Sequence, residues 1–118
     1  MTNKERIQEI YQMMNEGKAL EAFDKYYDEN VVMIEGDGNK REGKATNRKY
    51  EENFFAGVKQ IHDGGTPFIT NDESNNVTMV ETWMDVEFKD GNRMKLEQVA
   101  RQKWNEGKII EERFYYNN

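Results

Sequence analysis

Residues 81–100 read ETWMDVEFKDGNRMKLEQVA, and the way this stretch folds decides the architecture of the chain. Two strand-like segments flank Asp90-Gly91, a dipeptide that is typical of a tight β-hairpin turn. A two-residue turn at this position pairs Lys89 with Asn92 and makes the two strands antiparallel. Because successive residues of a strand point to opposite faces, the same turn also determines which side chains face the interior.

This register predicts one sheet face that carries no Lys or Arg and holds both tryptophans. The hairpin places Asp85 opposite Leu96, and a three-residue loop at residues 105–107 extends the pairing to a last strand. The face then consists of Met79, Glu81, Trp83, Asp85, Met94, Leu96, Gln98, Ala100, Gln102, Trp104, Ile110, Glu112, Phe114 and Tyr116. We expect this to be the covered face, so Glu81 and Asp85 point inward.

Carboxylates that point inward indicate a pocket. A buried carboxylate costs several kcal/mol unless it meets a partner, water or a ligand. The alternative is a register shifted by one residue, which puts Glu81 and Asp85 in solvent. In the predicted register the pocket has apolar walls and binds a small molecule. The predicted ligand-binding residues are Glu81, Trp83, Gln98, Glu112, Phe114, Tyr116, Tyr50 and Phe54.

The rest of the chain predicts three helices followed by strands. Apolar residues at helical spacing indicate helices at residues 3–15, around Leu20–Tyr27 and at 44–57; strands are expected at 31–34, 58–70, 76–89, 92–104 and 108–116. Pro67 and the preceding Gly64-Gly65 pair indicate that the strand at 58–70 is an edge strand or contains a bulge. This order predicts an α+β fold with helices on one face of an antiparallel sheet.

Length and composition limit the possible functions. The 118 residues fit one domain, residues 1–118. The net charge of −6 and the scattered Lys and Arg argue against a nucleic-acid partner. There is no Cys, and acids with a single His lack characteristic ligand spacing, so we expect neither a metal site nor a cofactor.

The same composition gives expectations about location and assembly. The N-terminus has no apolar run long enough for a signal peptide or a membrane span, so we expect a cytoplasmic protein without a membrane partner. Hydrophobic residues make up only 36% of the chain, which leaves a thin core for a monomer. A core that is partly shared between two copies, in a homodimer, is therefore expected.

Three segments carry a resemblance to a known family: YYDENVVMIEGDG at 26–38, EGK at 42–44 and WNEGKIIEERFYY at 104–116. With the order of elements, they make the whole chain resemble the SnoaL-like group of the nuclear-transport-factor-two-like superfamily. The resemblance implies a cone-shaped α+β barrel in which a curved sheet wraps three helices around a pocket. It also implies a homodimer formed through the convex face of the sheet.

Ketosteroid isomerases and polyketide cyclases belong to this superfamily. The resemblance implies that a carboxylate at the end of the first strand moves a proton beside a carbonyl group, and Glu35 occupies that place. Isomerases also use a tyrosine and a protonated acid as hydrogen-bond donors. Those positions fall on Ile10 and Ala100, which cannot donate. Tyr11 lies one residue away, turned by about 100° on the helix.

Two main functions remain open, and a third, a protein-interaction adaptor, would need an exposed apolar patch beyond the dimer face. In the first, a homodimer binds a small, largely apolar organic molecule and abstracts a proton next to a carbonyl, as an isomerase, cyclase or hydratase. Glu35 or Asp85 is then the base, and His62 or Tyr116 assists. In the second, the protein is a non-catalytic, ligand-binding or stress-associated dimer whose pocket acids are structural. Glu35 is then a solvated residue before a turn, and His62 lies at a strand end.

Overall fold

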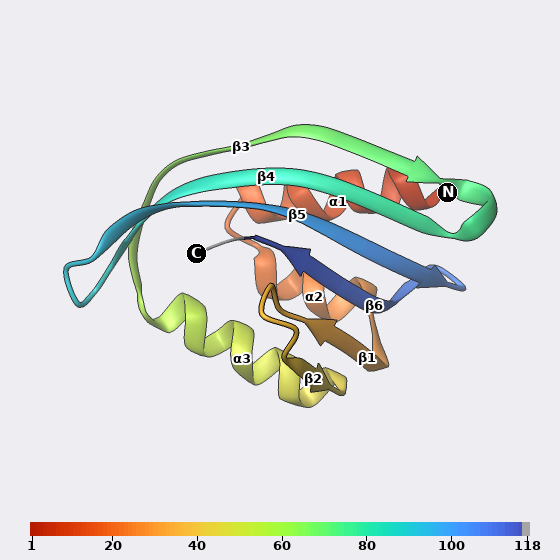
Figure 1. The fold of residues 1–118 in the computed structure, drawn as a ribbon, viewed down its shortest axis with the longest axis horizontal. Helices are drawn as coiled ribbons and strands as arrows, with labels where there is room; N and C mark the ends of the chain where they lie inside the picture. The colour runs from red at the N-terminus through yellow and green to blue at the C-terminus, as the bar shows by residue number, and fades with distance from the viewer. Residues whose placement is uncertain (117–118) are drawn as a thin grey trace.

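A computed structural model describes residues 1–116 as three helices and one six-stranded sheet (Figure 1). The elements are α1 (Asn3–Asn15), α2 (Ala19–Tyr26), β1 (Tyr27–Ile34), β2 (Lys40–Glu42), α3 (Lys44–Ala56), β3 (Val58–Asp72), η1 (Glu73–Asn75), β4 (Val77–Phe88), β5 (Arg93–Asn105) and β6 (Lys108–Tyr115). The predicted domain also included Asn117 and Asn118, which lie outside the described residues. No helix within residues 1–116 combines the length and the apolar character needed to cross a membrane.

The sheet has the strand order β2-β1-β6-β5-β4-β3 and does not close into a full barrel. The predicted α+β fold and its helices are confirmed, but the sheet is mixed because β1 runs parallel to β6. The prediction of a purely antiparallel sheet is wrong at this pair. Parallel neighbours need a long connection, and here residues 35–107 lie between the two strands. The short strand β2 was not predicted because it follows a Gly-rich turn.

The helices cover the concave side of the sheet. The strands β3 to β6 curve over α1 and α2, while α3 lies beside β1 and β2 (Figure 1). Helix α1 begins with a capping box, in which the Thr2 hydroxyl accepts a hydrogen bond from the Glu5 backbone and the Glu5 carboxylate accepts one from the Thr2 backbone. The core between helices and sheet consists of Ile7, Ile10, Ala22, Phe23, Tyr26, Tyr27, Val31, Met33, Val80, Trp104 and Ile109.

The β4–β5 turn differs from the prediction by one residue. The Phe88 backbone N–H donates to Asn92 O, and the Gly91 N–H donates to Phe88 O. The loop therefore has three residues rather than two, with Gly91 at φ +96° in the position that requires a positive angle. The Asp90 carboxylate accepts a hydrogen bond from the Asn92 N–H, which stabilises this wider turn.

The β5–β6 turn is shorter than predicted, whereas the β4–β5 turn is longer. The predicted three-residue loop is a two-residue turn, Glu106-Gly107, in which both residues have positive φ and Asn105 pairs with Lys108. A bulge between Lys103 and Trp104 then shifts the register once more. Beyond the bulge the β5–β6 pairing is displaced by two residues from the prediction, so the predicted faces hold there. Before the bulge the displacement is one residue, and the prediction that Ile110 faces the interior is wrong: Ile109 is fully buried and Ile110 is exposed.

These turns correct the predicted faces. In β4 the wider turn places Asp85 opposite Lys95 and Glu81 opposite Val99, so the prediction that the two acids point inward is wrong. The concave face is formed instead by Thr78, Val80, Thr82, Met84 and Val86 of β4, together with Leu96, Gln98, Ala100 and Gln102 of β5 and Glu112 and Phe114 of β6. The one-residue shift considered above is therefore the arrangement that the protein adopts.

Strand β3 lies at the edge of the sheet, as Pro67 and its neighbouring glycines predicted. The pairing with β4 shifts between Gly65 and Phe68, which is the segment that contains the proline. A proline cannot donate to a neighbouring strand, so an edge position with a bulge accommodates it.

Candidate functional site

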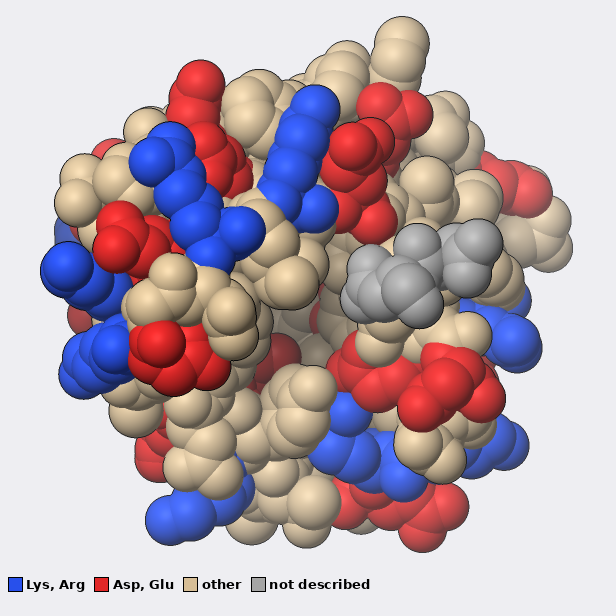
Figure 2. All heavy atoms as spheres, turned by 60° about the vertical axis from the view of Figure 1, so that its left-hand side comes forward, with Lys and Arg blue, Asp and Glu red and all other residues tan. Residues whose placement is uncertain are grey.

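A cavity of about 270 Å³ opens between α1, α3 and the concave face of the sheet. Figure 2 shows an opening in this face of the molecule, with acidic atoms visible inside it. The volume lies just below the roughly 300–1,000 Å³ of pockets for drug-sized ligands, so it suits a small molecule. The walls are mainly aromatic, and the lining includes Tyr11, Phe23, Tyr27, Glu35, Tyr50, Glu51, Phe54, Phe55, Gln98, Glu112, Phe114 and Tyr116.

Glu112 on β6 is a buried carboxyl group in the wall of this cavity, 3% exposed. Its Oε1 lies 2.5 Å from the Tyr27 hydroxyl, and its Oε2 accepts a hydrogen bond of 2.7 Å from Gln102 Nε2. Within the described residues no Lys, Arg or His forms an ion pair with it. Burial therefore raises the pKa of Glu112 above its ordinary value, although the hydrogen bonds oppose this shift.

Behind Glu112, a row of buried polar side chains crosses the sheet. Trp104 Nε1 donates to Thr78 Oγ1 over 2.8 Å, and the Thr78 hydroxyl donates to Gln102 Oε1 over 2.7 Å. Gln102 and Thr78 are fully buried, and Trp104 is 3% exposed. Each polar group in the row thus has a partner, as burial requires.

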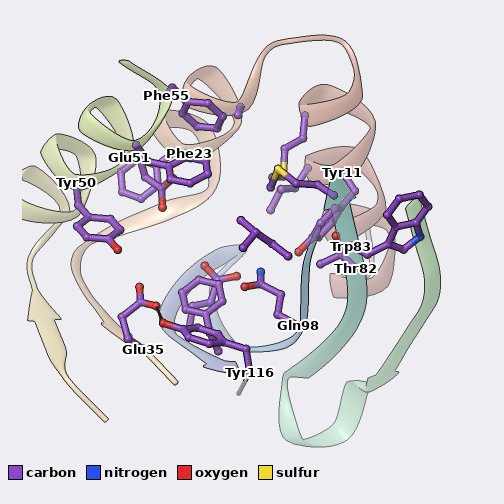
Figure 3. A pocket seen from close by; sticks show the side chains of 18 of the residues that line it. Tyr11, Phe23, Glu35, Tyr50, Glu51, Phe55, Thr82, Trp83, Gln98 and Tyr116 are labelled. Atoms are coloured by element: carbon purple, nitrogen blue, oxygen red, sulfur yellow. Dashed lines mark hydrogen bonds between the residues drawn. The ribbon is translucent and has the colours of Figure 1, made fainter. Parts of the chain in front are cut away.

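Glu35 lies at the end of β1, where the sequence placed it, and it is already paired. Its Oε1 is 2.7 Å from Arg41 Nη2, and its Oε2 accepts a hydrogen bond of 2.5 Å from the Tyr116 hydroxyl (Figure 3). The Arg41–Glu35 contact has the distance of an ion pair but not the N–H direction of a good hydrogen bond. Burial and the neighbouring carboxylate raise the pKa of Tyr116 to about 12.

Arg41 is held rigidly at this position. Its Nε donates to Asn47 Oδ1 over 3.1 Å, and the Asn47 amide donates to the backbone oxygens of Arg41 and Gly43. The guanidinium carbon stacks 3.5 Å from the centre of the Tyr50 ring. The guanidinium of Arg41 is therefore fixed toward Glu35.

Glu51 on α3 differs from the other two acids. It lies in the cavity wall (Figure 3), and no hydrogen bond or ion pair with another residue in the range 1–116 involves its carboxyl group. Burial and the nearby Glu112 raise its pKa to about 7, while Arg41 partly opposes the shift. Glu51 is therefore a carboxyl group that changes protonation near neutral pH and faces open space.

Tyr11 lies across the cavity on α1 (Figure 3). Burial raises the pKa of its hydroxyl, and the acids Glu112 and Glu51 add to the shift. The hydroxyl therefore stays protonated and can donate a hydrogen bond. Although the helix turns Tyr11 by about 100° from Ile10, both residues line the cavity, and Ile10 packs mainly into the core.

The predicted ligand-binding residues divide into two groups. The structure brings Tyr50, Phe54, Gln98, Glu112, Phe114 and Tyr116 together around the cavity. Trp83 borders the cavity, but its indole points away from the cavity (Figure 3) and lies against Gly65 of β3, with Lys95 Nζ 4.9 Å from the ring centre. Glu81 lies on the outer face and is exposed.

Two of the three predicted catalytic residues also lie outside the cavity. Asp85 accepts two hydrogen bonds from the Arg93 guanidinium, and this contact lowers the pKa of Asp85. His62 Nε2 lies 2.8 Å from Glu87 Oε1 on the same outer surface. Only Glu35 of the predicted catalytic set reaches the cavity. Among residues 1–116 no group of three His, Cys, Asp or Glu is arranged to hold a metal ion.

Sequence reasoning missed Glu51, Arg41 and Tyr27. A signal for Glu51 was present, because Asn47, Glu51 and Phe54 follow helical spacing and mark one inward face of α3. Arg41 had no such signal, since it lies in a short strand that the Gly-rich segment concealed.

The family model of the SnoaL-like domain matches residues 1–116. Among solved structures, a provisionally named SnoaL-like polyketide cyclase from Mesorhizobium loti is 23% identical, with a TM-score of 0.85 over 98% of this chain and 100% of the other. A provisionally named polyketide cyclase from Pseudomonas putida is 20% identical, with a TM-score of 0.83 over 99% of this chain and 92% of the other.

A provisionally named isomerase from Bacillus subtilis is also similar, at 20% identity and a TM-score of 0.81 over 99% of this chain and 90% of the other. At these identities the solved structures establish the fold alone. No curated protein matches the sequence.

Proposed function

Because the chain belongs to the SnoaL-like domain family, we propose that it binds a small, largely apolar organic molecule in its cavity and removes a proton from a carbon next to a carbonyl group. The observation that carries this proposal is Glu51: a carboxyl group in an aromatic cavity, with no partner among residues 1–116 and with a pKa raised to about 7. A general base works best when its pKa lies near the working pH.

The cavity supplies the other parts that such a reaction needs. In the ionised form Glu51 accepts the proton from the substrate carbon, and the electron pair of that C–H bond moves to the carbonyl oxygen. The Tyr11 hydroxyl is available to donate a hydrogen bond to this oxygen, which stabilises the developing negative charge. In a ketone with a β,γ double bond, return of the proton from Glu51 to the γ-carbon of the dienolate completes an isomerisation. The aromatic walls exclude water from the intermediate.

In this account Glu35 shapes the site and is not the base. Arg41 and Tyr116 occupy its two oxygens, so a proton acceptor there would first have to break an ion pair. The resemblance to the family favours Glu35 as the base, whereas the geometry of the cavity favours Glu51. One assay distinguishes the two assignments.

The assay uses small ketones, such as cyclohexanone and acetophenone, in D₂O. Abstraction of a proton next to the carbonyl exchanges it for deuterium, and NMR follows the loss of the proton signal without requiring the natural substrate. We expect catalysed exchange that E51Q abolishes. E35Q should reduce it far less, and E111Q, the control on the outer face, should not change it. Loss of exchange in E35Q with full activity in E51Q would assign the base to Glu35.

The second candidate function is a non-catalytic dimer that binds a ligand, and the closed Glu35–Arg41 pair favours it, since that acid is neutralised. Such a protein would bind small aromatic ketones in the cavity but exchange no protons on any of them.

A homodimer formed through the convex face of the sheet, in the cytoplasm, is also part of the proposal. Apolar side chains on that face support it: Phe68 and Met79 are 68% and 37% exposed, and Tyr115 is 42% exposed. Val99 lies between Glu81 and Tyr115 in a shallow groove of this surface. We expect Val99→Lys to convert a dimer into monomers in analytical ultracentrifugation. A wild-type monomer would contradict the assembly.

A further inference from the structure

We propose that Glu112 carries a proton on Oε1, that the row Trp104–Thr78–Gln102 fixes the proton on this oxygen, and that Tyr27 thereby becomes a hydrogen-bond donor to a ligand in the cavity. This inference concerns the cavity already described. It rests on the proposed function only in taking the ligand to carry a carbonyl or similar oxygen.

The direction of the hydrogen bonds begins at Trp104. An indole N–H can only donate, so the Thr78 oxygen accepts from Trp104, and the Thr78 hydroxyl uses its own hydrogen on Gln102 Oε1. The Gln102 amide then presents its NH₂ group to Glu112 Oε2. Because that oxygen accepts a hydrogen bond, a proton on Glu112 has its place on Oε1, which faces Tyr27.

The charges around Glu112 favour the protonated form. The groups that face it are the hydroxyls of Tyr27 and Tyr11, the acids Glu51 and Glu35, and the guanidinium of Arg41. The one cation among them is paired with Glu35. A buried carboxylate that faces two other acids and has no cation of its own is strongly disfavoured. Burial raises the pKa of Glu112 accordingly.

Protonation of Glu112 determines what Tyr27 does. The Glu112 Oε1 and the Tyr27 hydroxyl lie 2.5 Å apart and share one hydrogen bond. When Glu112 supplies the hydrogen, the hydrogen of Tyr27 has to point elsewhere, and no other partner of this hydroxyl occurs within residues 1–116. Tyr27 lines the cavity, so its free hydrogen is available to a ligand oxygen. Trp104, Thr78, Gln102 and Glu112 are then positioning residues, and Tyr27 is the residue that touches the ligand.

Infrared spectroscopy of protein labelled with ¹³C-glutamate tests the proton directly. At pH 7 we expect a C=O stretching band of a protonated carboxyl group that is absent in E112Q and retained in E51Q and in the outer-face control E111Q. In Y27F the band should move to higher frequency, because the proton loses its acceptor. Absence of any band that depends on Glu112 would overturn the proposal. A band that Y27F does not shift would place the proton on Oε2 and overturn the role of the row.

Binding of 4-nitrophenol tests the role of Tyr27. Its phenolic oxygen accepts hydrogen bonds, and its absorbance reports binding. We expect Y27F to weaken binding about tenfold, the effect of one lost hydrogen bond in an apolar site. E112Q should stay within about twofold of wild type, because its amide oxygen accepts from Gln102 and its NH₂ donates to Tyr27, as the protonated acid does. Equal affinity for wild type and Y27F, or no saturable binding, would overturn the ligand-facing role. Ketone exchange is measured separately, so its failure would leave this result standing.

Discussion

Glu35 Oε1 lies 2.7 Å from Arg41 Nη2 at the edge of the cavity, so the carboxylate at the end of β1 is paired before any ligand arrives. The Tyr116 hydroxyl occupies its second oxygen. Glu35, Glu51 and Glu112 line the cavity together, and the guanidinium of Arg41, which faces all three, is paired with Glu35. The carboxyl group of Glu51 therefore has no partner in the part of the chain that the structure describes, and burial together with the nearby Glu112 raises its pKa.

Replacing Arg41 tests this distribution. The guanidinium lowers the pKa of Glu51, so R41M should raise that pKa above about 7 and move the pH profile of ketone exchange upward by as much as about 1 unit. The pair between Arg48 on α3 and Asp24 on α2 offers a control, since R48M removes the same charge away from the cavity. The pH profile of exchange, measured for both variants, checks the expectation. If R41M has the same pH profile as the wild type, Arg41 does not influence the pKa of the base.

The free energy of unfolding should depend on pH through Glu51. Its pKa is raised in the folded protein, from an ordinary value of 4.5 to about 7, so the folded state binds more protons between these values. Stability from this group is full below about pH 4.5 and falls by about 3 kcal/mol as the pH rises through 7. E51Q should lose less stability as the pH rises. The loss that remains is due to Glu112, whose pKa is also raised in the folded protein. Urea unfolding of the wild type and of E51Q at pH 5 and pH 8 measures how much stability each protein loses between the two pH values. An equal loss in both proteins would contradict the prediction.

Gly36 makes room for Tyr116. A Cβ atom at Gly36 would lie 2.9 Å from the Tyr116 ring and from its backbone oxygen. We expect G36A to displace the ring, break the contact with Glu35 and destabilise the protein by about 1–3 kcal/mol. Y116F, which loses only the hydroxyl, should cost about 1 kcal/mol. Denaturant unfolding compares them with G57A, where the nearest atom is 3.5 Å away and little change is expected. Equal stability of G36A and G57A would contradict this packing.

The outer-face residues should not affect catalysis. Asp85 pairs with Arg93, and His62 lies beside Glu87, both on the far side of the sheet from the cavity. D85N and H62Q should therefore leave ketone exchange within about twofold of wild type. Their effect on stability should stay below about 1 kcal/mol, as for other exposed pairs. A tenfold drop in exchange for either variant would return that residue to the candidate site.

The sequence predicted the elements of this fold better than their faces. Helix α1 was predicted with the correct limits because Ile7 and Ile10 mark its buried stripe and Gly17 follows its end. The face of β4 depended on a single turn, and Asp90-Gly91 is compatible with both a two-residue and a three-residue loop. The local chemistry of the turn favours the second, since Asp90 accepts from the Asn92 N–H. One residue in this loop decided the place of Asp85.

The candidate site was predicted in part for the same reason. Gln98, Glu112 and Phe114 belong to β5 and β6, where two shifts of one residue added up to two residues and left these side chains on the predicted face. The pairing of Glu35 with Arg41 could not be predicted, because it depends on the short strand β2 and on Asn47, which holds the guanidinium from α3. Contacts of this kind arise from the packing of distant segments and leave no periodic pattern.

The titration of Glu51 tests the central claim most directly. ¹³C NMR of the glutamate side-chain carboxyl carbon, assigned by its absence in E51Q, follows the protonation of this group without a substrate. We expect a midpoint near pH 7. A midpoint near 4.5, the ordinary value for glutamate, would show a solvated carboxylate and would contradict the assignment of Glu51 as the base.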